Sequence, residues 1–438
     1  MSSRCLIWVL VLACVGCATY EDRLRPVHEA FYSGRLAEAE ENLRDQVDDG
    51  PVTDKTLLQI ELASVLQARE RYAEAAQLLA AADERLEVLD YSAAPIDALV
   101  EFAFAIDDVW RASPPERVMI NTQNMLNYLG AGDLEGAAVE ARRLVILLSQ
   151  SDLTADERYS NSFGWGLAGI ILAAGGDLEE AKDAFAQLPA NNALRAPARP
   201  QGHGTILVVC QLGRAPIRRQ ARYWITTGGA PHQLNIPVMQ KRPGGASSAS
   251  VSLDGNDRGV VQMMFDLSDQ LMRRYDDEFP RLVAAAVTQV VPRALAGKAI
   301  AKGVEMAIED EGDSEAEEAA AELVGALVGF LGESAVAATQ VADVRCWSLL
   351  PGNYGAMRLD VAPGQHSLSV ALSGVGLPRQ VSVDVGPGEL VLVNIISEPG
   401  AGYRELAEPR GSDLTYQPVG LAALDLLEHG TWEYNELN

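Results

Sequence analysis

The sequence predicts an α+β multidomain protein, with an all-α superhelix of repeats in the first half, a mixed α/β domain after it, and a C-terminal antiparallel β-module. Two observations lead to this fold class. A short phrase recurs four times before residue 190, each time between segments with helical periodicity. After residue 342, short apolar runs alternate with Pro-Gly turns, a pattern typical of antiparallel strands.

The N-terminus has the pattern of a lipoprotein signal peptide. Arg4 precedes an apolar run of about ten residues, which suits a signal peptide and is shorter than the ~20 residues of a membrane-spanning helix. Small residues and a cysteine end the run, and the thiol of such a cysteine receives the lipid during processing. We expect residues 1–16 to be removed and Cys17 to be lipidated, with Cys14 as the alternative. Ala18 follows in place of an Asp, which favours the outer membrane, facing the periplasm.

The net charge of −26 limits the partners of the 438-residue chain. It argues against nucleic acid, whose phosphates would repel the protein, and against electrostatic adhesion to anionic lipid. We therefore expect membrane attachment through the N-terminal lipid only. Two cysteines remain in the body of the chain, Cys210 and Cys346, both in strand-like apolar runs. They could pair in an oxidising periplasm or lie buried as small apolar residues, and the sequence leaves both readings open.

The recurring phrase predicts helical pairs over residues 17–190. Its first residue is placed at a turn, where glycine adopts a conformation that other residues resist, and its final alanine lets the next helix approach closely. The four copies are Gly34–Ala39, Glu70–Ala75, Gly132–Ala137 and Gly176–Ala181. They resemble the tetratricopeptide repeat, whose period is about 34 residues. Irregular spacing indicates a further degenerate repeat near 91–111, and stacked pairs would form a concave surface for a peptide or protein.

Residues 191–201 contain Pro197 and Pro200 without periodicity, which indicates a linker. The domain predicted over 202–341 begins with a continuous apolar run at 202–211, typical of a buried central strand. Weaker strand patterns follow at 223–226, 234–238, 250–253 and 260–264, and helical periodicity covers 267–308. An acidic loop at 310–318 precedes an apolar stretch with regularly spaced glycines at 319–341. We expect a buried helix there, with a membrane-touching or oligomerising segment as the alternative.

The C-terminal β-module is predicted over 342–397, with strands at 344–350, 356–361, 367–372, 380–385 and 389–396, and an extended tail over 398–438. Asp343, Arg345 and Trp347 alternate along the first of these strands and would share one face. An Asp–Arg ion pair covered by the Trp would either lock helix against sheet or contact a partner. Arg142 and Arg143 would organise the inner face of the repeats or remain solvated helix charges.

Residue types that carry chemistry are not grouped in this sequence. No two of the five histidines have metal-ligand spacing, and Cys-x-x-Cys is absent outside the signal region. His203, between two glycines, is the most attractive single candidate because it could lie exposed at the start of a strand, but we do not expect a catalytic role for it. The sequence therefore predicts no catalytic residue, no metal, no cofactor and no enzymatic activity.

Several phrases together resemble a family of uncharacterised bacterial envelope lipoproteins with N-terminal tetratricopeptide-like repeats. The phrases are Gly16-Cys17, Glu116–Asn121, Ala138–Arg143, Leu207–Pro216 and Ala342–Pro351. The resemblance extends to about Val393, and Cys210 and Cys346 depart from it. It implies localisation and architecture but no activity.

The predicted function is a non-enzymatic scaffold, tethered in the cell envelope by its lipid, whose repeats bind a protein or peptide. This rests on analogy with other repeat proteins. The alternative is an enzyme or ligand-binding protein that acts on cell-wall or glycan material through the second half. The identity of the partner and the oligomeric state are not fixed by the sequence.

Overall fold

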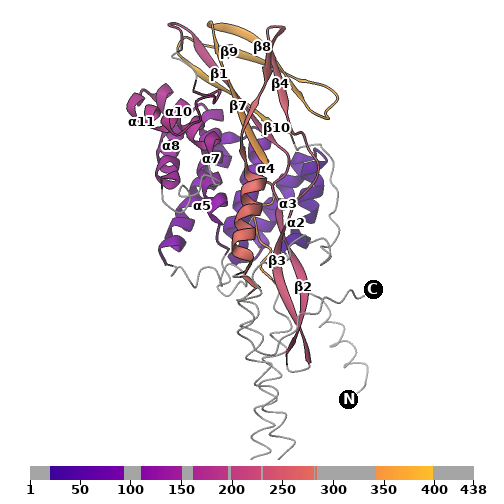
Figure 1. The fold of residues 1–438 in the computed structure, drawn as a ribbon. Coiled ribbons are helices and arrows are strands. Elements are labelled where there is room, and N and C mark those ends of the chain that lie inside the picture. Colours follow the sequence, from indigo (N-terminus) through magenta and orange to yellow (C-terminus); the bar gives the residue numbers. More distant parts are fainter. Residues whose placement is uncertain are drawn as a thin grey trace, which may run out of the picture.

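The fold of the chain is seen in a computed structural model, which describes residues 20–92, 110–149, 161–195, 199–227, 230–280, 282–283 and 342–397. These ranges combine helices and sheets, so the predicted α+β class is confirmed (Figure 1). The signal peptide with Cys14 and Cys17, the acidic loop, the stretch 319–341 and the C-terminal tail lie outside the described residues. So does most of the degenerate repeat predicted near 91–111.

The described part of the first half contains four helical pairs. They are α2 (Tyr20–Tyr32) with α3 (Leu36–Asp49), α4 (Lys55–Ala68) with α5 (Tyr72–Ser92), α7 (Pro114–Gly130) with α8 (Leu134–Leu148), and α10 (Ser162–Gly175) with α11 (Leu178–Ala186). A short 3₁₀ helix, Val52–Asp54, precedes α4. Successive pairs also pack on each other, through α3 with α4, α5 with α7, and α8 with α10.

The recurring phrase forms the turn inside each pair, as predicted. Gly34, Gly132 and Gly176 have φ angles of 78°, 78° and 93°. Glu70 takes the same place in the second pair with a φ of 60°. This left-handed conformation is unfavourable for a residue with a Cβ atom, so glycine is the usual choice. The alanine that ends each phrase is buried in the helical core.

Two four-stranded sheets follow. The first has the order β10 (Leu390–Ile396), β1 (Gly204–Leu212), β7 (Asn353–Val361), β6 (Gln262–Asp266). The second has the order β5 (Asn256–Val260), β4 (Ala249–Leu253), β8 (Gly364–Leu372), β9 (Arg379–Val385). β1 is antiparallel to β7 and parallel to β10. Residues 267–280, directly after β6, are helical.

The prediction of a separate antiparallel module over 342–397 is wrong. β7 and β10 pair with β1, and β8 pairs with β4, so both sheets contain strands from each side of the proposed boundary. The predicted strand at 344–350 is also wrong, because that segment has no strand partner. Apolar alternation and Pro-Gly turns indicate where strands lie, but not which distant strand each one joins.

β1 belongs to the middle layer of three, because its sheet lies between the helices and the second sheet. Ile206, Val208 and Cys210 belong to the core between the two sheets. Leu207 and Val209 belong to the core shared with the helices. Because both faces of β1 are buried, its sequence is continuously apolar rather than alternating.

A two-stranded ribbon projects from the helices and the two sheets, which together are called the body. It consists of β2 (Ile217–Thr227) and β3 (Ala230–Gln240), which pair along their whole length. Figure 1 shows the ribbon extending away from the sheets, toward the end opposite β8 and β9. Among the described residues, no helix is both long and apolar enough to cross a bilayer.

Candidate functional site

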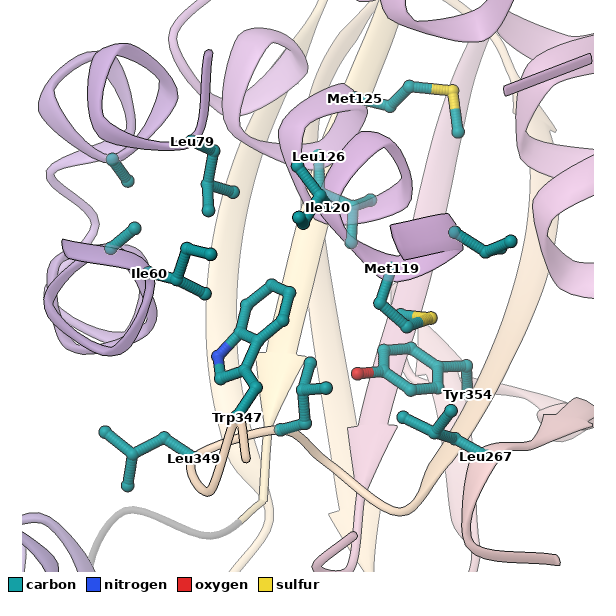
Figure 2. Close-up of a cluster of buried hydrophobic side chains, with 14 of the residues drawn as sticks. Ile60, Leu79, Met119, Ile120, Met125, Leu126, Leu267, Trp347, Leu349 and Tyr354 are labelled. Atoms are coloured by element: carbon teal, nitrogen blue, oxygen red, sulfur yellow. The ribbon is translucent and has the colours of Figure 1, made fainter. Parts of the chain in front are cut away.

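Residues 342–350 form an extended segment, here called the strap, that lies between the helical pairs and the root of the ribbon. Every residue of the strap is buried. Trp347, Leu349 and Leu350 join the helical core. Figure 2 shows the Trp347 side chain pointing from the strap toward Ile60 of α4 and Ile120 of α7. Its Nε1 atom donates a hydrogen bond of 2.8 Å to Ser64 Oγ, also on α4.

Two buried glutamates hold the strap backbone. Glu61 accepts hydrogen bonds from the amide of Ser348 at 2.6 Å, from its hydroxyl at 2.6 Å, and from the amide of Leu349 at 3.0 Å. Glu116 accepts from the amide of Trp347 at 2.8 Å. Its other oxygen accepts from the amide and hydroxyl of Ser113 and so caps α7. Three consecutive strap amides, those of residues 347–349, are therefore satisfied by carboxylates of α4 and α7 instead of by a neighbouring strand.

The guanidinium of Arg345 joins the strap to the 3₁₀ helix between the first two helical pairs. It donates to both oxygens of Asp343, at 2.9 and 2.7 Å, and to Asp54 at 3.0 Å. Burial opposes the charge on Arg345, but its hydrogen bonds to Asp343 and Asp54 and the negative charges of these two carboxylates outweigh burial and raise the pKa of Arg345. From the root of the ribbon, Arg218 donates to the carbonyl of Arg345 at 3.3 Å.

The structure brings together one of the two groups of residues predicted as sites. The ion pair expected between Asp343 and Arg345 is present, and Trp347 lies in the same segment, although that segment is not a strand. Arg142 and Arg143 lie elsewhere, on α8.

The two arginines of α8 link it to other helices. Arg142 donates to Glu180 of α11 at 2.9 Å and also to Asp177. Arg143 donates to Asp83 of α5 at 2.8 Å. The two arginine side chains are 41% and 45% exposed, and the carboxylates that pair with Arg142 are also partly exposed, whereas Asp83 is buried.

A histidine, a serine and a glutamate meet at the strap, a grouping that sequence reasoning missed because the three positions are far apart in the chain. His28 Nε2 lies 2.7 Å from Ser348 Oγ, and that hydroxyl donates to Glu61. Burial, together with the charges of Arg242 and Arg214, lowers the pKa of His28 to about 3. Burial raises the pKa of Glu61 to about 7, against the hydrogen bonds from Ser348 and Leu349.

These residue types resemble a nucleophile, base and acid, but their arrangement does not suit catalysis. The acid contacts the serine instead of orienting the histidine. A histidine with a pKa of about 3 is a poor proton acceptor at neutral pH, and Ser348 is only 3% exposed. The three groups therefore fix the strap in place.

Polar side chains also surround a small cavity beside Trp347. Gln123 donates to Gln211 of β1 and to Tyr354 of β7, both at 2.9 Å, and Gln67 donates to Asn127 at 2.8 Å. The cavity has a volume of about 10 Å³, enough for one water molecule. It cannot admit a sugar or a peptide side chain.

The two body cysteines are both free and buried. Cys210 lies between the sheets, and Cys346 lies in the strap, where its sulfur accepts the amide of Arg218 at 3.4 Å. Burial raises the pKa of each thiol to about 12, so neither is a reactive thiolate near neutral pH.

His203 lies in the turn before β1, where its Nδ1 is 3.4 Å from the carbonyl of Gln201. Within the part of the chain that the structure describes, no group of three or more His, Cys, Asp or Glu residues could hold a metal ion. Comparison with protein-family models finds no match, and comparison with curated proteins finds none either.

Proposed function

We propose that this chain is a lipid-anchored, non-enzymatic scaffold of the cell envelope. A lipid on Cys17, or on Cys14, tethers it to the outer membrane on the periplasmic side. Its helical pairs form a tetratricopeptide-like superhelix that binds a protein or peptide partner. The signal-like N-terminus supports the anchor, and the stacked helical pairs with left-handed turns support the superhelix.

The contacts of the strap carry this proposal. The strap touches α2 through His28, α4 through Glu61 and α7 through Glu116. These are the first helices of three successive pairs, so the first helices form one continuous inner face. An extended segment held there by carboxylates on its amides is bound in the manner of a peptide ligand. Because the chain itself occupies this face, the partner must bind the outer face, which the second helices form.

The outer face offers an exposed apolar patch on α8 and α11, here called the α8 patch. It consists of Val139, Arg142, Ile146 and Leu178. Val139 and Ile146 are 50% and 63% exposed and lie seven residues apart, on one side of α8. Leu178, the first residue of α11, is 66% exposed. The ion pair of Arg142 with Asp177, which directly precedes Leu178, holds this end of α11 beside α8. Exposed apolar side chains around an arginine are typical of protein interfaces.

Crosslinking and pull-down from membranes test the proposal. We expect the double substitution Val139→Asp with Ile146→Asp to abolish capture of the proteins that the unchanged chain captures. Leu377→Asp is the matched control, because Leu377 is 82% exposed in the turn between β8 and β9, and we expect that variant to retain them. Both variants should melt like the unchanged chain. An unchanged partner set in the double variant would refute binding through the α8 patch, and an unlipidated mature N-terminus in mass spectrometry would refute the anchor.

A further inference from the structure

The N-terminal end of α2 lies beside the β2–β3 ribbon. Arg219, the third residue of β2, forms an ion pair with Glu21. At the other end of α2, the Tyr32 hydroxyl accepts a hydrogen bond of 3.0 Å from Arg242, which follows β3 and also donates to the carbonyl of Ala215. The helix therefore runs along the root of the ribbon, and its first residues point toward the ribbon tip.

This orientation determines which end of the body faces an anchored lipid. Cys17 precedes Tyr20 by three residues, which span at most about 10 Å. From Arg219 to Thr227 the ribbon continues for about 26 Å, at 3.3 Å per residue. A lipid on Cys17 would therefore lie at the level of the ribbon, and the ribbon tip would extend beyond it.

The distal ribbon is uncharged in a strongly charged protein. No Asp, Glu, Lys or Arg occurs from Tyr223 to Gln240, although such residues make up 22% of the chain. Arg222, which directly precedes this run and pairs with Asn235 across the ribbon, is exposed. The run opens with Tyr223, Trp224 and Ile225. Aromatic residues next to cations are typical of the boundary between membrane and water, where cations meet anionic headgroups.

The backbone limits how deep such a ribbon can enter. Within the described residues, no third strand pairs with β2 or β3, so their outer edges keep polar groups that hydrocarbon cannot satisfy. Pro231 and Pro237 remove amide donors from β3, which makes the ribbon a poor template for a strand of another chain. The hydrated headgroup region accepts both the uncharged side chains and the unpaired backbone.

We propose that the described distal part of the ribbon, Tyr223–Thr227 paired with Ala230–Leu234, lies in the headgroup region of the bilayer to which the lipid on Cys17 attaches the chain. The protein then touches the membrane at two points, the lipid and the ribbon, and these fix the orientation of the body. The inference rests on the proposed lipid anchor, and it adds a contact made by the polypeptide to the attachment through lipid alone.

A fluorescent label tests this contact. Thr227→Cys is labelled with a nitrobenzoxadiazole dye in the mature chain from residue 17, whose residue 17 is changed to Ser and which carries an N-terminal histidine tag. The tag binds nickel-chelating lipid in vesicles of phosphatidylethanolamine and phosphatidylglycerol. The buried Cys210 and Cys346 leave the introduced cysteine as the reactive one. We expect dithionite to reduce this label several-fold more slowly than the same label on Leu377→Cys, and spin-labelled lipid to quench only the former.

Two further measurements separate the possible failures. Adding Ile225→Asp to the Thr227→Cys chain should restore fast reduction, whereas adding Val260→Asp, at an exposed edge position, should not. Equal reduction rates for the labels at 227 and 377 would overturn the ribbon contact. Because the tag replaces the lipid, this result is independent of the anchor. Flotation of the native chain with vesicles tests the anchor by itself.

Discussion

At the scale of a single residue, Glu61 determines how the strap responds to pH. Its pKa rises from 4.5 to about 7 on folding, so between these values the folded chain keeps a proton that the unfolded chain has released. The stability from this group is present below pH 4.5 and is lost as pH rises through 7. The pKa of His28 falls from 6.5 to about 3, so its contribution is present above pH 6.5 and is lost as pH falls toward 3.

The substitution Glu61→Gln should reveal these opposite pH dependences of the stability contributed by Glu61 and His28. Glutamine offers one acceptor oxygen to the three donors of the strap, so we expect a destabilisation of ~1–3 kcal/mol. The loss should be larger at pH 5 than at pH 8, because only the unchanged chain loses stability from Glu61 over that interval. Urea unfolding at both pH values measures it. His28→Gln is the control and should show the opposite trend; a cost of Glu61→Gln that does not vary with pH would contradict the raised pKa.

Glu70 provides a second test at this scale. It adopts a φ of 60° where the other turns have glycine, and its side chain is exposed. We expect Glu70→Gly to stabilise the fold by up to ~1 kcal/mol in thermal or urea unfolding, since the left-handed strain outweighs the added freedom of the unfolded chain. The reverse change, Gly132→Ala, meets no atom within 4 Å and should cost ~1 kcal/mol through the backbone alone. Destabilisation by both substitutions would contradict this account of the turns.

At the scale of elements, the strap connects the helices, the sheet and the ribbon root. Trp347 is 2% exposed, and we expect Trp347→Ala to cost ~3–5 kcal/mol in urea unfolding. Trp347→Phe keeps most of the volume and loses the hydrogen bond to Ser64, so its cost should be ~1 kcal/mol. Unchanged stability of the alanine variant together with lost partner capture would instead assign Trp347 to a partner contact.

The helical pairs could be predicted from sequence, and the strap could not. A turn glycine and a nearby buried alanine are local signals, so the four phrases identified the pairs directly. The strap has the alternation of a strand because it is extended and buried. Whether an extended segment joins a sheet depends on which groups accept the hydrogen bonds of its backbone amides. Here the acceptors are Glu61 and Glu116, more than 200 positions earlier in the chain. The parallel partner of β1 was missed for the same reason.

At the scale of the whole molecule, the contacts of the helices with the strap and the sheets distinguish this chain from an open array of repeats. In such an array each repeat contacts only its neighbours. Here α2, α4 and α7 also contact the strap, α7 packs against β10, and α10 packs against β6 and β7. Deleting a helical pair would therefore expose the sheet core as well. Surface substitutions on the α8 patch are the cleaner way to separate binding from folding.

The lipid anchor should decide where the protein is found, because the polypeptide without its lipid is expected to bind a membrane only weakly. With a net charge of −26 it is repelled by anionic lipid, and an uncharged ribbon in the headgroups adds a weak contact that needs the lipid beside it. We expect Cys17→Ser to move the chain from the membrane fraction to the soluble periplasmic fraction, as followed by fractionation and immunoblotting, while Cys14→Ser leaves it bound. Release by Cys14→Ser alone would transfer the lipid to that residue. Membrane retention of the double variant after removal of residues 1–16 would mean that the mature polypeptide, and above all its ribbon, binds the membrane despite the charge repulsion.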